Sequence, residues 1–363
     1  MRAARAVIDL QALAHNLQHA RAAAPQQQVL AVIKADGYGH GIVPVAEALA
    51  DADGFGVACL DEAMQLREAG IRKPILLLEG FFHADELAAI GAHGLHIVVH
   101  QQFQLRTLEA AAGKAWPYAP LSAWLKVDTG MHRLGFEVEE APSAWSRLCA
   151  CPLIAQPPKL MTHLANADDL DDQSTRRQLQ TFAGLLPDAR TERSIANSAG
   201  ILGWPATLGD VVRPGIMLFG ASPFPGEAAE RRGLRPAMTF STELFAIRQC
   251  KRGDAVGYGG AWVCPEDMAI GVAAVGYGDG YPRHAAPGTP VLVNGRRVPL
   301  VGRVSMDMIT VDLRAYPEAA LGDPVVLWGE GLPAEEVAEA ASTISYELFC
   351  GVTARVRREY VNG

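Results

Sequence analysis

The sequence lacks the features that mark secreted, membrane and metal-stabilised proteins. It has six cysteines in 363 residues, and no two of them form a Cys-x-x-Cys pair or a zinc-ligand pattern. Neither a disulfide framework nor a metal site is therefore expected in a chain of this length. No apolar run is long enough to span a membrane, and the first residues lack the apolar core of a secretory signal. The reducing cytoplasm is the simplest compartment for such a protein.

Positive charge is also scarce. Lys and Arg total 32 against 40 for Asp and Glu, which gives a net charge of −8, and no segment concentrates basic residues. A nucleic-acid partner is therefore not expected. Hydrophobic residues make up 49% and charged residues 20%, which is a globular composition. Because 363 residues are too many for one ordinary core, we expect two domains.

The first part of the chain alternates short apolar runs with helical segments. Several segments between the runs have helical periodicity, among them 43–50, 61–68, 85–90 and 174–185. Eight strands that alternate with helices are typical of a (β/α)₈ barrel of the TIM type, so we predict an α/β barrel domain over residues 1–233. The predicted strands are 29–33, 54–59, 75–79, 96–100, 123–127, 159–163, 192–196 and 210–213.

The pattern changes after a segment rich in Pro, Gly and Glu at 222–233. Beyond it glycines are frequent and β-branched residues alternate, and only 334–341 is clearly helical. An Asn-Gly pair between the apolar runs of 291–298 predicts a hairpin. We therefore predict a mostly-β C-terminal domain over 234–363. Its other predicted strands are 254–260, 269–275, 301–311 and 324–328.

Lys34 stands where the buried run 29–33 meets a glycine-rich turn. Gly37, Gly39 and Gly41 permit backbone conformations that other residues resist. A lysine is a poor packing residue at such a place but a good one for forming a Schiff base, because its pKa shifts readily when it is partly desolvated. The alternative is a solvated lysine at a strand end, and position alone does not separate the two.

Polar and basic residues follow several of the predicted strands. In a barrel the carboxyl ends of the strands meet at one mouth, so we expect these side chains to lie together. A lysine that can form an imine, a histidine that can cover a ring, and hydroxyl and N–H groups that can hold a phosphate suit an anionic aromatic cofactor. Each residue also has an ordinary explanation, as a core histidine, a helix cap or a turn. The predicted set is Lys34, Lys126, Asp128, Arg133, His163, Asn197, Ser198, Arg213 and Gly215.

Arg213 is the most diagnostic member of this set. An arginine stays protonated in proteins and only donates hydrogen bonds. If Arg213 faces a pyridine nitrogen, that nitrogen remains unprotonated and the cofactor is a weaker electron sink. The arrangement discourages long-lived carbanion chemistry and favours a simple proton exchange.

Two further features bear on acid–base chemistry. Tyr258 lies in a glycine-rich segment of the β half, and a tyrosine that normally titrates near 10 needs a cationic neighbour to act as a base. Lys126 and Arg133 are seven residues apart, and if they share a small site one of them must be paired, deprotonated or modified.

Seven motifs in one order along nearly the whole chain resemble those of the bacterial alanine racemases, pyridoxal 5′-phosphate (PLP) enzymes of fold type III that join a barrel to a β domain. The segment Ala-Val-Ile-Lys-Ala-Asp-Gly-Tyr-Gly-His-Gly at 31–41 resembles the cofactor-lysine signature of that family. Seven ordered motifs are far more specific than any one of them. The other six lie at 126–135, 197–200, 213–216, 276–280, 301–307 and 342–346.

The resemblance implies racemisation of alanine by two bases in a homodimer whose subunits share the active site. Lys34 would carry PLP and move a proton on the D-alanine side, and Tyr258 from the other subunit would be the base for L-alanine. Lys126 would be carbamylated, which gives an anion that orients Arg133 beside the phenolic oxygen of the cofactor and the substrate. The remaining implied roles are Arg213 at the pyridine nitrogen, His163 against the ring, Tyr38, Ser198, Gly215, Ile216 and Tyr346 at the phosphate, Asn197 as a further cofactor-binding residue, Met306 at the substrate carboxylate, and Tyr277, Asp307 and Tyr346 at the entrance.

Three other classes of protein share parts of this pattern. A basic-amino-acid decarboxylase also joins a PLP barrel to a β domain, but its pyridine nitrogen normally faces an acid where this chain has Arg213. A broad-specificity racemase is usually exported, and no secretory signal is seen here. A PLP-binding regulatory protein resembles the barrel alone. Alanine racemisation is therefore the preferred function, with D-alanine supplied for peptidoglycan or consumed by a catabolic enzyme.

Overall fold

The structure, a computed structural model, describes residues 3–185 and 191–363. The chain divides into two compact units, which we call the barrel unit and the β unit. The barrel unit comprises Leu17–Gly37 and Val45–Gly215, and the β unit comprises Met1–Asn16, Tyr38–Pro44 and Ile216–Gly363. The division into domains 1–233 and 234–363 stays a prediction.

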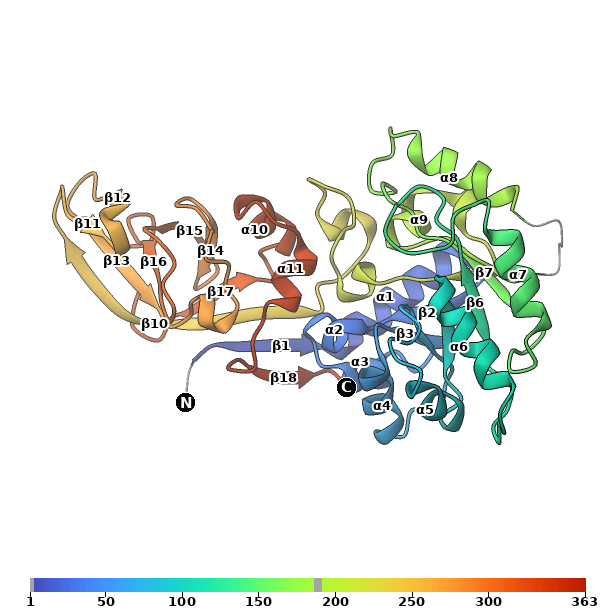
Figure 1. Cartoon of the computed structure of the whole chain (residues 1–363). Coiled ribbons are helices and arrows are strands. Elements are labelled where there is room, and N and C mark those ends of the chain that lie inside the picture. The colour runs from blue at the N-terminus through green and yellow to red at the C-terminus, as the bar shows by residue number, and fades with distance from the viewer. Residues whose placement is uncertain (1–2, 186–190) are drawn as a thin grey trace. The chain divides into compact units, whose positions relative to one another are not determined.

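The barrel unit is built on a parallel sheet whose strand order is β8-β7-β6-β5-β4-β3-β2-β9. Figure 1 labels β2, β3, β6 and β7 of this sheet. Between the two outer strands, Asp210 N–H donates to Arg193 O at 2.8 Å and Arg213 N–H to Ala196 O at 3.0 Å, so the sheet closes on itself. The predicted barrel is confirmed, and every predicted strand has its counterpart. In the described part of the chain the strands are β2 (Gln28–Val32), β3 (Gly54–Val57), β4 (Ile75–Leu77), β5 (His96–Val99), β6 (Ala123–Lys126), β7 (Lys159–Met161), β8 (Arg193–Ser194) and β9 (Val211–Val212).

Helices connect these strands along the chain. Helix α8 shows why they form: its buried residues Thr175, Gln178 and Phe182 are three and four positions apart, which places them on one helical face. The four segments predicted from periodicity correspond to α3, α4, α5 and α8. The helices of residues 3–185 and 191–215 are α1 (Leu10–Ala23), α2 (Lys34–Tyr38), α3 (Ile42–Ala48), α4 (Leu60–Glu68), α5 (Glu86–Ala92), α6 (Gln102–Ala112), α7 (Ala141–Ala150), α8 (Ser174–Ala183) and α9 (Ser198–Gly203).

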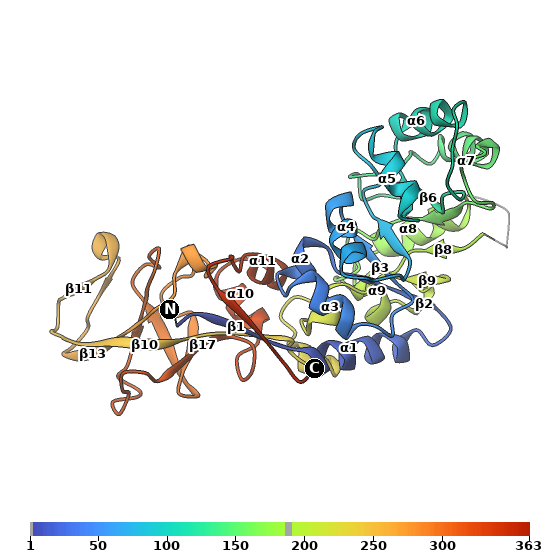
Figure 2. The same cartoon turned by 90° about the horizontal axis from the view of Figure 1, so that it is seen from below.

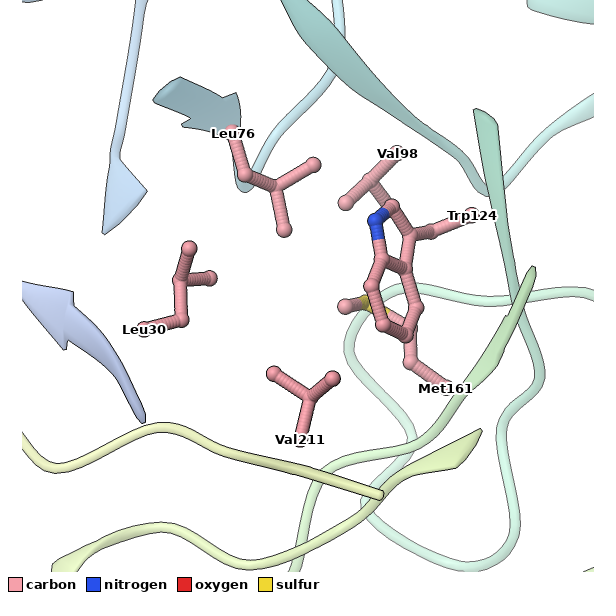
Figure 3. Close-up of a cluster of buried hydrophobic side chains, with 6 residues drawn as sticks. All are labelled: Leu30, Leu76, Val98, Trp124, Met161 and Val211. Carbon is pink, nitrogen blue, oxygen red and sulfur yellow. The ribbon is translucent and has the colours of Figure 1, made fainter. Parts of the chain in front are cut away.

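Apolar side chains fill the interior of the barrel unit. Figure 3 shows six buried side chains from six different strands that converge on one central space. Trp124 is the largest of them and is 3% exposed. Because the middle of the barrel is filled, polar side chains can gather only at the ends of the strands. The six are Leu30, Leu76, Val98, Trp124, Met161 and Val211.

The β unit has a sheet of order β13-β16-β15-β14-β17-β10-β1-β18, and β10 also pairs with β13, so six of these strands form a closed ring. In Figure 2 the long strand β10 runs beside β17, its antiparallel neighbour. The predicted mostly-β domain is confirmed. Its described strands and helices are β1 (Arg5–Asp9), β10 (Met238–Cys250), β11 (Ala255–Val256), β12 (Trp262–Val263), β13 (Met268–Ala273), β14 (Pro290–Val293), β15 (Arg296–Val301), β16 (Ile309–Asp312), β17 (Pro324–Trp328), β18 (Arg357–Val361), α10 (Ala334–Ala340) and α11 (Ser345–Cys350).

In the β unit, the strand predictions succeeded or failed at the turns between strands. Asn294 and Gly295 both have positive φ, 48° and 76°, which makes the predicted tight hairpin between β14 and β15. The single strand predicted over 301–311 was wrong, because β15 ends at Val301 and β16 begins at Ile309. The strand predicted over 254–260 was wrong in its second half, which is the 3₁₀ turn Tyr258–Gly260. Among the described residues, no helix is both long and apolar enough to cross a membrane.

Candidate active site

Lys34 lies two residues after the end of β2 and begins a turn with left-handed backbone geometry. Ala35, Asp36 and Gly37 have φ of 54°, 53° and 61°. The sequence predicted such conformations for the glycines, but here residues with a Cβ adopt them as well, which is unfavourable without support from the surrounding structure. Lys34 itself is partly buried at the strand ends of the barrel unit.

Arg213 follows β9 and is 5% exposed. Its guanidinium donates to Thr162 O at 2.7 Å, to Ile195 O at 3.2 Å and to Ser194 Oγ, and its Nη2 lies 3.3 Å from His163 Nδ1. No carboxylate among the described residues forms an ion pair with it. Burial lowers the pKa of Arg213 to about 10, so it stays protonated at neutral pH. The structure therefore holds a buried cation whose direction is fixed by the ends of β7 and β8.

Lys126 ends β6 and is 8% exposed. Burial lowers the pKa of Lys126 to about 8, and the charges of Arg213 and Arg133 act in the same direction while Asp128 opposes them. Burial, Arg213 and Lys126 likewise lower the pKa of His163 well below its ordinary value, so its ring is neutral near pH 7. These mutual effects show that the cations predicted at the barrel mouth do share one region.

Asn197 and Ser198 lie at the start of α9, and Ser198 contacts the segment that follows β9. Asn197 is the N-cap of α9, and its side-chain oxygen accepts from Gly200 N–H at 2.9 Å. The hydroxyl of Ser198, which is buried, accepts from Gly215 N–H at 2.9 Å. The ordinary interpretation of Asn197 as a helix cap is therefore confirmed, and Ser198 and Gly215 are in contact.

The remaining candidates belong to the β unit, where Tyr38 and Tyr346 lie near each other. The ring of Tyr38 stacks on Phe219 with centroids 4.6 Å apart, and its centroid is 6.0 Å from that of Tyr346. Ile216 begins the 3₁₀ turn Ile216–Phe219 that supplies the stacking ring. Burial raises the pKa of Tyr38 far above its ordinary value, so this phenol stays neutral.

Tyr277, Met306 and Asp307 also come together within the β unit. A Cβ at Gly276 would lie 2.4 Å from Met306 O, so the turn that carries Tyr277 packs on Met306 only because residue 276 is glycine. Asp307 accepts a hydrogen bond from Arg355 Nη2 at 2.6 Å. The loop between β15 and β16, for which a strand is predicted from the sequence, thus places Met306 and Asp307 beside Tyr277.

Tyr258 lies at the tip of the two-stranded hairpin of β11 and β12. Gly257 and Gly259, with φ of 72° and 70°, flank it. Its side chain is 70% exposed, an unusual position for a large aromatic residue unless something else covers it. The geometry makes this phenol available to a second molecule.

Comparison with known proteins identifies the family. The sequence profile of the alanine racemase N-terminal domain matches residues 8–223, and that of the alanine racemase C-terminal domain matches residues 237–360. The chain belongs to the alanine racemase family. Together these two matches account for nearly all of it, as the ordered motifs predicted.

Individual members of the family agree with this assignment over their full lengths. An alanine racemase from Halorhodospira halophila is 53% identical over 363 residues, which is 100% of this chain and 99% of that protein. The crystal structure of the biosynthetic alanine racemase from Pseudomonas aeruginosa has a TM-score of 0.96 and 47% identity, with 100% of both chains covered. An alanine racemase from Bartonella henselae, with a TM-score of 0.88 and 28% identity over 99% of this chain and 100% of that one, carries covalently bound pyridoxal phosphate.

Alanine racemase motifs alone did not point to the residues that hold the candidate site in place. Gln178 on α8 donates to His163 O at 2.9 Å and to Thr129 Oγ1 at 3.2 Å, and it accepts from Ala165 N–H at 2.9 Å. Ser194 accepts from the guanidinium of Arg213. The position of Gln178 on the same helical face as Thr175 and Phe182 is the one sequence signal that could have indicated its burial. The role of Ser194 depends on Arg213, which lies further along the chain.

Proposed function

We propose that this member of the alanine racemase family interconverts L-alanine and D-alanine with PLP attached to Lys34. The observation that carries the proposal is the group of cations at the strand ends of the barrel unit. Arg213 is buried there without a carboxylate partner among the described residues, and Lys126 and Arg133 lie in the same region. A buried, uncompensated cation is costly, so this region suits a ligand that brings negative charge and a lone pair. PLP has both, in its phosphate, its phenolic oxygen and its pyridine nitrogen.

The residues present fit each part of this cofactor. Lys34 would supply the amine for covalent attachment, Arg213 would donate to the pyridine nitrogen, and the ring of His163, which is neutral near pH 7, would pack against the cofactor ring. Arg133 would lie by the phenolic oxygen. The residues that would hold the phosphate are Tyr38, Asn197, Ser198, Gly215, Ile216 and Tyr346. When bound, PLP withdraws electrons from the substrate and makes its α-hydrogen acidic.

Two bases on opposite faces of the substrate account for inversion. Lys34 holds or delivers the proton on the D-alanine side, and Tyr258 of the partner subunit does so on the L-alanine side. A single base would mostly return the proton to the face from which it came. Each base contributes roughly 10²–10⁴-fold to the rate. The exposure of Tyr258 at a hairpin tip supports its use by a second copy of the chain in a homodimer.

The rest of the site orients the substrate. The backbone of Met306 and the side chain of Arg133 receive the carboxylate of alanine, and Tyr277, Asp307 and Tyr346 shape the entrance. Because the pKa of Lys126 is about 8, part of its amine is neutral near pH 7 and can add to CO₂ with loss of a proton. The resulting carbamate is an anion that pairs with Arg133 and relieves the repulsion among the cations.

Other activities of PLP barrels fit the site less well. A basic-amino-acid decarboxylase normally needs an acid at the pyridine nitrogen, whereas this proposal assigns that position to the buried guanidinium of Arg213. A broad-specificity racemase remains the closer alternative, because one methylene in a pocket changes discrimination by only about 1–3 kcal/mol. D-alanine supply for peptidoglycan and alanine catabolism both agree with the chemistry.

The test is an absorbance spectrum of the purified protein followed by addition of L-alanine and detection of D-alanine with a D-amino-acid oxidase. We expect visible absorbance from lysine-bound PLP and formation of D-alanine. Lys34→Ala should lose that absorbance, whereas Tyr258→Phe should keep it and lose most activity in both directions. A Tyr258→Phe variant with near-normal rates both ways would refute the two-base assignment, and absorbance retained in Lys34→Ala would refute the attachment site.

A further inference from the structure

Glu62 connects the turn that contains Lys34 to a neighbouring helix of the barrel unit. It is the third residue of α4, which follows β3. Its Oε1 accepts from Ala35 N–H at 2.7 Å, and its Oε2 accepts from Ala58 N–H at 2.7 Å. One carboxylate therefore binds the backbone of two different strand-to-helix connections, one of which begins at Lys34.

The bond to Ala35 acts on a residue whose backbone conformation needs support. Ala35 opens the left-handed run, with φ 54° and ψ 54°, and residues with a Cβ rarely adopt this conformation. At the other end of the turn, Gly37 N–H donates to Ile33 O at 2.9 Å. A hydrogen bond to an ionised carboxylate is stronger than one between neutral groups, so Glu62 is well suited to hold Ala35 in place.

The same bond fixes the direction of Lys34. The N–H of Ala35 and the carbonyl of Lys34 belong to one planar peptide unit. When Glu62 holds that N–H, it fixes the orientation of this plane and hence the direction in which the Lys34 side chain leaves the backbone. A reacting amine on a flexible four-carbon side chain gains most from a fixed starting direction, since misplacement of a reacting group slows reaction steeply.

We propose that Glu62 is a positioning residue that aims Lys34 by holding the peptide plane between Lys34 and Ala35. This inference rests on the proposed function, in which Lys34 attaches PLP and moves a proton. It assigns Glu62 no contact with the substrate or the cofactor. Loss of the carboxylate therefore slows the reactions of the Lys34 amine without changing how alanine is recognised.

Glu86 provides a matched control. It is the first residue of α5, and its Oε1 accepts from Phe82 N–H at 3.0 Å and His83 N–H at 2.7 Å. Like Glu62, it binds two backbone N–H groups at the start of a helix after a barrel strand. Both of its donors lie in its own connection, so Glu86→Ala removes a comparable pair of bonds without releasing the turn at Lys34.

The experiment measures covalent coupling of PLP to Lys34 in the apoprotein, trapped by borohydride reduction and located by peptide mass spectrometry, together with kcat and KM for alanine. We expect Glu62→Ala to slow coupling and lower kcat by roughly tenfold to a hundredfold with KM nearly unchanged. Glu62→Gln, which keeps one acceptor oxygen and the side-chain volume, should fall between it and the unmodified protein. Glu86→Ala should match the unmodified protein, and circular dichroism shows whether each variant is folded.

Some results would overturn the positioning role while leaving the proposed function intact. One is coupling at the normal rate in folded Glu62→Ala and Glu62→Gln, and another is equal slowing in Glu86→Ala, which would indicate a general loss of structure. A rise in KM with unchanged kcat also contradicts it, because that pattern belongs to substrate recognition. If the unmodified protein fails to attach PLP at Lys34, the proposed function and the role of Glu62 fall together.

Discussion

Replacement of Lys126 by methionine tests the electrostatics of the barrel mouth directly. The variant Lys126→Met removes the charge and keeps an unbranched side chain of similar length. Lys126 is buried, and burial together with Arg213 and Arg133 lowers its pKa from 10.5 to about 8. Between these pH values the unfolded chain binds more protons than the folded one, so the free energy of unfolding rises with pH.

The magnitude follows from the size of the shift. One pKa unit corresponds to about 1.36 kcal/mol, so the change from 10.5 to about 8 represents roughly 3 kcal/mol. This penalty is fully present below about pH 8 and is relieved as the pH rises toward 10.5. We therefore expect apo Lys126→Met to be more stable than the unmodified protein near pH 7, by up to roughly 3 kcal/mol, with a difference that shrinks toward pH 10.

The assay is urea denaturation of the apoproteins in CO₂-free buffer across this pH range. Lys114, whose side chain is exposed, gives the control variant Lys114→Met. If the free energy of unfolding depended on pH equally in Lys126→Met and in the unmodified protein, the reasoning would be refuted, because a buried lysine with a lowered pKa must change that dependence.

Addition of bicarbonate gives a second test, since carbamylation of the folded state would stabilise it by mass action. In bicarbonate, only the protein that retains Lys126 should gain stability. An equal gain in Lys126→Met would exclude Lys126 as the modified residue.

Three other changes have expected effects on the free energy of unfolding, each measurable by urea denaturation. Ser194→Ala removes an acceptor of the buried guanidinium and should cost about 1.5–3 kcal/mol; a cost near zero would mean that the guanidinium finds another partner. Gly220→Ala should cost several kcal/mol, because a Cβ there would lie 1.8 Å from a backbone oxygen. Gly253 also has positive φ but no atom lies within 4 Å of the position that a Cβ would take, so Gly253→Ala should cost only about 1 kcal/mol. Equal costs for the two variants would contradict the predicted clash at Gly220. Trp124→Ala should cost about 3–5 kcal/mol and Phe82→Ala, which is 52% exposed, much less; the reverse order would contradict the assignment of the core.

The sequence was a good guide to the barrel because its strands are buried on both sides. A strand such as β2 is then a continuous apolar run bounded by turn residues, which is readable without any knowledge of its neighbours. The strand β1 was not predicted, since its partners β10 and β18 lie more than two hundred residues further along the chain. Nothing in a local pattern states which distant strand completes a sheet.

In the candidate site, likewise, some residues could be predicted from the sequence and others could not. Lys34, Lys126 and Arg213 were predicted because each closes or follows a strand, and parallel strands in a barrel bring those positions together. Glu62 and Gln178 were not, because a carboxylate and an amide in ordinary amphipathic helices give no sign of the backbone groups that they bind. Residues that hold a site are defined by long-range partners, and only the structure supplies these.

Two energetically unfavourable features lie at one end of the barrel unit, and packing alone explains neither of them. Arg213 is buried as a cation without a carboxylate partner among the described residues, and Ala35 and Asp36 hold a backbone conformation that residues with a Cβ avoid. Stability alone would favour an apolar residue in the first place and glycines in the second. Such local departures from the rules of folding concentrate at functional sites. Both lie at the carboxyl ends of strands, β2 and β9, so these two departures favour this end of the barrel unit as the site of the proposed chemistry.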